Sequence, residues 1–119
     1  MTVAAAELTR QHCKPCEGGI PALSAEEVRG LLPGVPAWRL SSDGKRIRRE
    51  WRVKDFLTAL DFFQRVGELA QKEDHHPDLH LTGYRNAALE LSTHAVGGLT
   101  ENDFILAAKI DQLPVELKK

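Results

Sequence analysis

The sequence is short of cysteine, of long apolar runs and of net charge, and each shortage removes a class of protein. Two cysteines, Cys13 and Cys16, are too few for a disulfide scaffold. No apolar run approaches the roughly 20 residues that a membrane-spanning helix needs. The 16 lysines and arginines nearly balance the 17 acidic residues, so the net charge of −1 gives no reason to expect nucleic acid or a membrane as partner. The first residues lack a basic segment followed by an apolar core, so we expect no signal peptide and a cytoplasmic protein.

The remaining composition is that of a small globular protein. The chain has 119 residues, of which 42% are hydrophobic and 28% charged. A chain of this length forms one domain that needs no disulfide or metal to fold. Residues between Cys13 and Pro21 are mostly poor helix or strand formers. We therefore predict a partly flexible N-terminal tail over residues 1–21 and one domain over residues 22–119.

Three segments combine a capping residue with helically spaced apolar side chains. They are residues 24–32 behind Ser24, residues 55–73 behind Asp55 and residues 100–113 behind Thr100. Ser24 is followed three residues later by Glu27, which is the spacing of a capping box, and Thr100 is followed in the same way by Asp103. Each of the three segments is therefore predicted to be a helix.

Four segments alternate apolar and polar residues and predict strands, at about 36–41, 45–53, 79–84 and 87–92. Turn signals at 42–44 and 85–86 join them in two hairpins. The order helix–strand–strand–helix–strand–strand–helix predicts an α+β fold, with three helices on one face of a four-stranded antiparallel sheet. Arg49 falls on the apolar face of its strand, so its side chain must snorkel or pair. The basic run over residues 45–54 is expected to be a solvated strand face or a subunit interface.

Four of the five histidines lie between residues 75 and 94. If residues 79–84 and 87–94 pair as a hairpin, His94 returns to the neighbourhood of His75 and His76. His80 alternates with apolar neighbours and is expected on the other face of the sheet. Strand pairing therefore predicts a pocket of three histidines, with His80 outside it.

Three chemistries suit such a pocket. Imidazoles move protons near neutral pH, they bind zinc or iron, or they are polar side chains at a helix–strand junction. Acid–base chemistry is favoured over a metal, because adjacent histidines on an extended backbone diverge and no other ligand stands at a familiar spacing. The Cys13-Lys14-Pro15-Cys16 segment is half of a zinc knuckle, and a reduced flexible tail is the favoured interpretation. We therefore expect no metal.

The histidine segment and its surroundings resemble the pterin-4a-carbinolamine dehydratases. The resemblance covers about residues 13–112 and rests on Asp74-His75-His76-Pro77-Asp78-Leu79-His80-Leu81-Thr82, Tyr84, Leu91-Ser92-Thr93-His94 and Gly97-Gly98-Leu99-Thr100-Glu101-Asn102-Asp103. It implies a four-stranded antiparallel sheet with three helices and a reaction that needs no metal or organic cofactor. It also implies a hydro-lyase that dehydrates 4a-hydroxytetrahydrobiopterin to quinonoid dihydrobiopterin, and so recycles the pterin cofactor of aromatic amino acid hydroxylases.

By this resemblance His75, His76 and His94 are the catalytic histidines, two of them as acid and base and one to orient the pterin. The resemblance also suggests Asp74, Tyr84 and Asp103 as substrate-binding residues. Asp103 either holds a histidine or a pterin amine, and its alternative role is that of a helix-start carboxylate. For Asp74 the same alternatives are open, and for Tyr84 the alternative is hairpin or core packing.

The family also suggests partners. Its members form dimers and tetramers, and we expect a homodimer or homotetramer and a functional link to phenylalanine hydroxylase. Many members carry an acidic residue four positions before the first histidine, where this chain has Gln71. Related proteins that assist Rubisco assembly share the fold but have generally lost the site pattern, so a non-catalytic assembly or binding module is the second hypothesis.

Overall fold

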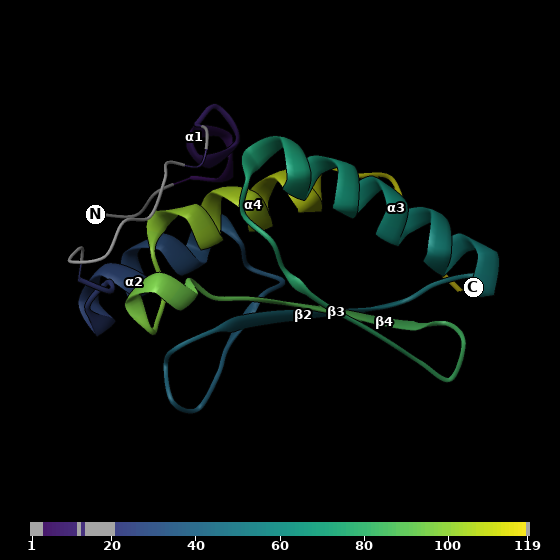
Figure 1. The fold of residues 1–119 in the computed structure, drawn as a ribbon, viewed down its shortest axis with the longest axis horizontal. Helices are drawn as coiled ribbons and strands as arrows, with labels where there is room; N and C mark the ends of the chain where they lie inside the picture. The colour runs from purple at the N-terminus through teal and green to yellow at the C-terminus, as the bar shows by residue number, and fades with distance from the viewer. Residues whose placement is uncertain (1–3, 12, 14–20, 119) are drawn as a thin grey trace.

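The computed structural model describes residues 4–11, 13 and 21–118 and has the predicted α+β architecture (Figure 1). Its elements along the chain are α1 (Ala5–Thr9), α2 (Ala25–Leu31), the 3₁₀ turn η1 (Leu32–Gly34), β1 (Arg39–Leu40), β2 (Ile47–Arg52), α3 (Phe56–Glu73), β3 (Asp78–Thr82), β4 (Asn86–Leu91), the 3₁₀ turn η2 (His94–Val96) and α4 (Glu101–Asp111). The three helices predicted from capping signals correspond to α2, α3 and α4, and each begins directly after its predicted cap.

The four strands form one antiparallel sheet in the order β1-β2-β4-β3. The two hairpins therefore meet where β2 pairs with β4, with Ile47 opposite Leu91. The second hairpin turns earlier than predicted, because Thr82 pairs with Asn86 and leaves a three-residue turn. Gly83 and Tyr84 in this turn both have positive φ, at 53° and 56°. β4 ends at Leu91, two residues before Thr93.

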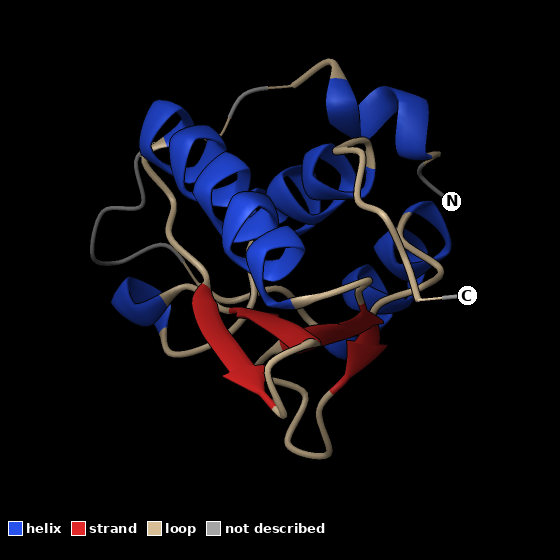
Figure 2. Ribbon diagram, turned by 90° about the vertical axis from the view of Figure 1, so that its right-hand side faces the viewer, coloured by secondary structure: helices blue, strands red, loops and turns tan. Residues whose placement is uncertain are grey.

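The long helices pack on one side of the sheet, and the core lies between these layers (Figure 2). Phe62 of α3 is buried against Trp51 of β2, with ring centroids 5.0 Å apart. The pairing predicted for Arg49 is confirmed: its guanidinium lies over the Trp51 ring and forms an ion pair with Asp111 of α4. A charge on the inner face of a strand is thus neutralised by the helix that covers it.

Part of the predicted N-terminal tail differs from expectation. Residues 5–9 form α1, and Leu8 is 1% exposed within the core. Cys13 lies against the domain too, since its backbone N–H donates to Glu73 at 2.9 Å and its Sγ lies 3.5 Å from the carbonyl oxygen of Asn102. These contacts join residues far apart in sequence, which local propensity does not encode. Cys16 lies outside the described residues.

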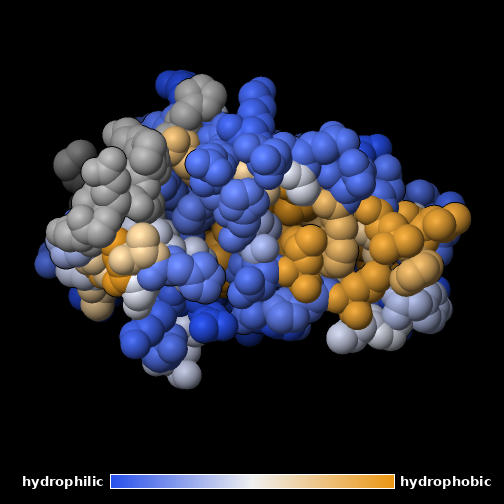
Figure 3. Space-filling model, viewed as in Figure 1, coloured by the Kyte–Doolittle hydropathy of each residue, from blue (hydrophilic) through white to orange (hydrophobic). Residues whose placement is uncertain are grey.

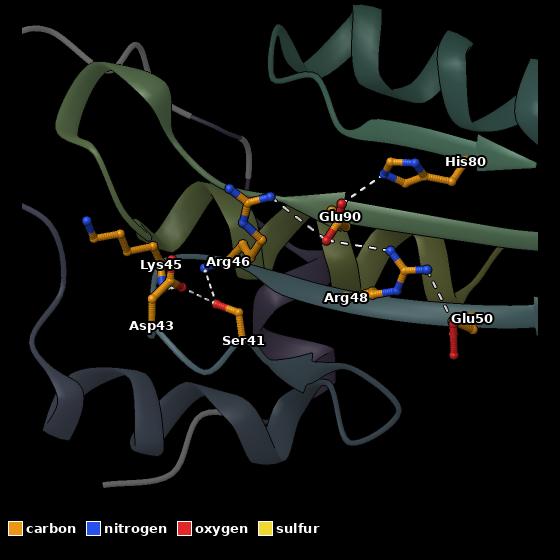
Figure 4. A network of polar contacts seen from close by, with 8 residues as sticks. All are labelled: Ser41, Asp43, Lys45, Arg46, Arg48, Glu50, His80 and Glu90. Carbon is orange, nitrogen blue, oxygen red and sulfur yellow. Dashed lines mark hydrogen bonds and ion pairs between the residues drawn. The ribbon is translucent and has the colours of Figure 1, made fainter.

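The other face of the sheet carries a polar network (Figure 4). Arg48 of β2 contacts Glu50 and the Glu90 carboxylate of β4, and Glu90 also bonds His80 of β3 at 2.8 Å. The prediction that His80 lies on the other face of the sheet is confirmed by this pairing. Among the described residues, no helix is long and apolar enough to span a membrane.

Candidate active site

Asp103 is the centre of a buried polar cluster that we call the Asp103 cluster, made of His75, Thr93, Thr100 and Asp103. Asp103 is the third residue of α4 and has no solvent exposure. The predicted capping box is present, and in it the Asp103 carboxylate accepts the backbone N–H of Thr100 at 2.9 Å. The helix start therefore fixes this carboxylate in the interior.

His75 reaches the cluster from the end of α3. The helix ends at Glu73, and Asp74 adopts a left-handed conformation with φ 54°. The next backbone N–H, that of His75, bonds back to the carbonyl oxygen of Ala70 at 3.2 Å. This tight C-terminal turn directs the imidazole inward, where His75 is 9% exposed and its Nε2 lies 2.6 Å from Asp103 Oδ1.

The contacts of the carboxylate determine which His75 nitrogen carries a proton. An ionised carboxylate only accepts hydrogen bonds, so the His75 Nε2 donates to Asp103. The Nδ1 atom is then the ring position that can take up or release a proton. A carboxylate behind an imidazole holds its tautomer and orientation, which is an arrangement found in proton-transfer sites.

The segment after β4 joins the same carboxylate. The hydroxyl of Thr93 donates to Asp103 Oδ2 at 2.9 Å, and Thr93 also pairs with Gly98 through the backbone. His94 follows directly as the first residue of η2 and is exposed. His75, and Thr93 directly before His94, therefore both contact the buried carboxylate of Asp103. The convergence of the three imidazole rings in one pocket stays a prediction.

The remaining predicted site residues differ in burial and position. His76 is exposed, with its Nε2 3.3 Å from Oε1 of Gln71, the residue that departs from the family pattern. Asp74 is exposed at the end of α3, next to His75. Tyr84 is 55% exposed in the β3–β4 turn, which is the opposite end of the hairpin from His94. Within one copy of the chain, Tyr84 is therefore not brought beside the histidines.

Asp103 combines two of its predicted roles. It was expected to hold either a histidine or a pterin amine, or to be a helix-start carboxylate. The structure gives it the first and the third roles together, because it bonds His75 and caps α4. Its two oxygens accept protein donors and it has no exposed surface, and its contact with a pterin amine stays a prediction.

A second buried ion pair lies beside the cluster. Glu73, the last residue of α3, contacts Lys109 of α4 at 3.1 Å and also accepts the backbone N–H of Cys13. Burial, followed by the negative charge of Glu73, raises the pKa of the Cys13 thiol from 9.0 to about 12. This contact holds the end of α3 against α4, and so fixes the backbone from which His75 projects.

Sequence reasoning did not identify Thr93 as part of the site. Its neighbour His94 and the cap residue Thr100 carried recognisable signals, whereas a threonine at a strand end carries none. Only the register of β4 shows that its hydroxyl reaches Asp103. In the part of the chain described here, no group of three or more histidine, cysteine or acidic side chains is arranged to hold a metal ion.

The fold and the cluster together define a class: an α+β protein with a buried imidazole–carboxylate pair and exposed histidines next to the cluster residues in sequence. Residues 21–113 match the family described as pterin 4 alpha carbinolamine dehydratase. The chain therefore belongs to the pterin-4a-carbinolamine dehydratase family, a family of hydro-lyases.

Individual relatives agree with this assignment. A protein of Arabidopsis thaliana named pterin-4-alpha-carbinolamine dehydratase 2, mitochondrial, is 50% identical over 114 residues, which are 93% of this chain and 61% of the plant protein. This chain thus spans about three fifths of that relative. A Methylococcus capsulatus protein with the same family name is 47% identical over 112 residues, covering 94% of this chain and 97% of that protein.

Two solved structures share the fold. One, from Brucella melitensis, is described as a transcriptional coactivator/pterin dehydratase and superimposes with a TM-score of 0.70 at 31% identity, over 76% of this chain and 95% of that one. The other is a pterin dehydratase-like RuBisCO assembly factor of the alpha-carboxysome, with a TM-score of 0.53 at 16% identity, over 63% and 86% of the two chains. At that identity the second likeness concerns the fold alone.

Proposed function

We propose that this protein dehydrates 4a-hydroxytetrahydrobiopterin to quinonoid dihydropterin by histidine acid–base catalysis. The observation that carries the proposal is the buried contact of 2.6 Å between His75 Nε2 and Asp103 Oδ1, formed by two residues of the family motif. Family membership supports the same reaction class. The product would serve the recycling of the pterin cofactor of aromatic amino acid hydroxylases, with phenylalanine hydroxylase as the expected functional partner.

The reaction needs two proton transfers. The bond between C4a and the hydroxyl oxygen breaks, and the oxygen leaves as water after an acid protonates it. A base removes the proton of the adjacent ring nitrogen, whose electron pair forms the new double bond to C4a. The atoms balance with one water released and no oxidant or reductant. Such acid and base groups contribute about 10²- to 10⁴-fold each to the rate.

His75 is suited to one of these transfers. The Asp103 carboxylate accepts the proton of its Nε2 and leaves Nδ1 to exchange a proton. His76 and His94 are exposed, and each directly follows a residue of the cluster in sequence. We assign to them the second transfer and the orientation of the pterin. Asp74, exposed beside His75, is proposed to bind a pterin amine.

The test measures the decay of chemically generated carbinolamine. His75→Ala is expected to slow turnover at least 100-fold, and His76→Ala and His94→Ala to reduce it too. His80→Ala is the matched control, because His80 also bonds a carboxylate but lies on the open face of the sheet, and it is expected to retain the wild-type rate. Wild-type protein that does not accelerate the decay above buffer would overturn the proposal.

A homodimer or homotetramer is the second part of the proposal. An apolar surface extends along the side where α3 overlies the sheet (Figure 3), and large exposed apolar side chains lie on both elements. They include Phe56 and Leu60 of α3, 47% and 43% exposed, and Leu79 of the edge strand β3, 46% exposed. A subunit contact would cover such a surface. Leu60→Glu is expected to lower the mass measured by light scattering, with Glu68→Gln, a surface change farther along α3, as the control.

The assembly-factor hypothesis has weaker support. The likeness to the RuBisCO assembly factor is a likeness of fold at 16% identity, whereas the His75–Asp103 contact has a chemical use that a scaffold does not need. For the enzyme we propose a cytoplasmic location, which fractionation of cells that express the full chain would test.

A further inference from the structure

Thr93 occupies a buried position between the two halves of the proposed site. It follows β4 and is 4% exposed. Its backbone closes a short loop, since its N–H donates to the carbonyl oxygen of Gly98 at 2.7 Å and the N–H of Gly98 returns to its carbonyl oxygen at 3.4 Å. His94 lies within this loop. The side chain of Thr93 bonds the Asp103 carboxylate outside this loop.

Each hydrogen bond of the cluster can be assigned a donor and an acceptor. Thr93 donates its single hydroxyl proton to Asp103 Oδ2 at 2.9 Å. The contact of 2.8 Å between the hydroxyl oxygens of Thr93 and Thr100 therefore has Thr100 as its donor. Asp103 Oδ2 receives two donors, the Thr93 hydroxyl and the Thr100 backbone N–H, and Oδ1 is left to His75.

This arrangement fixes the plane of the carboxylate. Two donors on Oδ2, from two different segments, resist rotation of the group, and Oδ1 is then held 2.6 Å from the His75 ring. The Thr100 N–H belongs to the helix start itself and moves with Asp103. The Thr93 hydroxyl comes from the loop of His94, so it is the donor that ties Asp103 to an independent part of the fold.

We propose that Thr93 is a positioning residue, which aligns the Asp103 carboxylate with His75 and couples that pair to the loop that carries His94. The proposal rests on the proposed dehydratase function, and it adds a residue to which the family resemblance gave no role. Thr93 does not touch the substrate, so it acts on the rate of proton transfer and not on pterin affinity.

The experiment compares two substitutions at this position. Thr93→Val keeps the shape and removes the hydroxyl, and Thr93→Ser keeps the hydroxyl and removes the methyl group. We expect Thr93→Val to lower kcat about 10- to 100-fold with KM changed less than about threefold, and Thr93→Ser to stay within about threefold of wild type. Thr82→Val, an exposed threonine of β3, is the matched control and is expected to be unchanged.

A second measurement needs no substrate and separates this proposal from the proposed function. The ¹⁵N NMR signals of the His75 ring report its tautomer and the hydrogen bond at Nε2. Thr93→Val should perturb them, with faster exchange of the Nε2 proton, whereas Thr93→Ser and Thr82→Val should not. If Thr93→Val does not fold, Thr93→Cys, a weaker donor, should give the same changes in smaller size.

The outcomes are distinguishable. Wild-type protein without dehydratase activity, but with the expected ring signals, would overturn the proposed reaction and leave the positioning role supported. A folded Thr93→Val protein with wild-type kcat and an unchanged His75 ring would overturn the positioning role. Equal losses in Thr93→Val and Thr93→Ser would also overturn it, because they would assign the effect to packing.

Discussion

Replacement of Asp103 by asparagine tests the central contact of the site with almost no change of shape. The carboxylate receives three donors: His75 Nε2, the Thr93 hydroxyl and the Thr100 N–H. An asparagine offers one acceptor oxygen and one NH₂ donor in place of the two carboxylate oxygens. Two of the donors converge on the Oδ2 position, so the amide oxygen is expected there and the NH₂ group against His75.

The His75 ring then meets a donor where it had an acceptor. It relieves this conflict by moving its proton from Nε2 to Nδ1, so that Nε2 accepts from the asparagine. Nδ1, the atom that was available for proton exchange, is then occupied by this proton. In a Ser-His-Asp triad the same exchange of aspartate for asparagine lowers kcat about 10⁴-fold through the wrong tautomer. We expect a loss of about 10²- to 10⁴-fold here, or about 3 to 5 kcal/mol of transition-state stabilisation.

The effect on folding should be smaller. The bonds of Thr93 and Thr100 persist to a neutral acceptor, and charge-assisted bonds of about 1.5–3 kcal/mol become neutral ones of about 0.5–1.5 kcal/mol. Relief of the buried charge offsets part of this difference. A loss of about 1–3 kcal/mol in the free energy of unfolding is therefore expected, which leaves a folded protein for assay.

The assay combines the carbinolamine decay with ¹⁵N NMR of the histidine rings. Asp111→Asn is the matched control, because Asp111 lies on the same helix and bonds Arg49 and Trp38 away from the histidines. It should lower stability without changing the His75 tautomer or kcat. A folded Asp103→Asn protein that keeps both the wild-type rate and the proton on Nε2 would refute the reasoning.

Three further predictions concern the core, the N-terminal segment and a helix cap. Phe62→Ala should destabilise the fold by about 3–5 kcal/mol in denaturant titration, because the ring is 1% exposed against Trp51, and a loss below about 1 kcal/mol would contradict that packing. Because the pKa of Cys13 is raised to about 12, the contribution of this thiol to stability should be constant below pH 9 and fall between pH 9 and 12, where the unfolded thiol ionises first; denaturant titrations at these pH values should show a smaller fall for Cys13→Ser than for the wild type. Ser24→Ala should cost about 1 kcal/mol by loss of its capping bond to Glu27, whereas Ser42→Ala, in the first hairpin turn, should be near neutral.

Local signals in the sequence anticipated most of the secondary structure. Ser24, Asp55 and Thr100 each mark the N-terminus of a helix, because a side-chain oxygen accepts a backbone N–H of the first turn that has no partner within the helix. Such contacts span one turn and need no knowledge of the fold. The second hairpin was placed less accurately, because the positive φ of Tyr84 permits a turn that residue preferences disfavour.

Contacts between distant segments were predicted only in outline. The sequence predicts a tail where the structure has α1. This helix depends on the burial of Leu8 and not on a strong local signal. The grouping of His75 with the region of His94 followed from strand pairing alone. The structure places Tyr84 in the turn of the hairpin and His94 beyond its open end, so the substrate-binding role of Tyr84 stays a prediction.

The sequence by itself determined the class of fold, the starts of three helices and the chemistry-bearing residues of the family motif. These depend on interactions within a turn of helix or along one strand, and they are written in the order of residues. The tertiary structure alone decided that Asp103 holds His75, 28 residues away, and that Thr93 shares the same carboxylate. The physical reason is that a buried hydrogen bond requires two rotamers, a strand register and the packing of α3 on α4 to agree, and no short segment of the chain contains all of them.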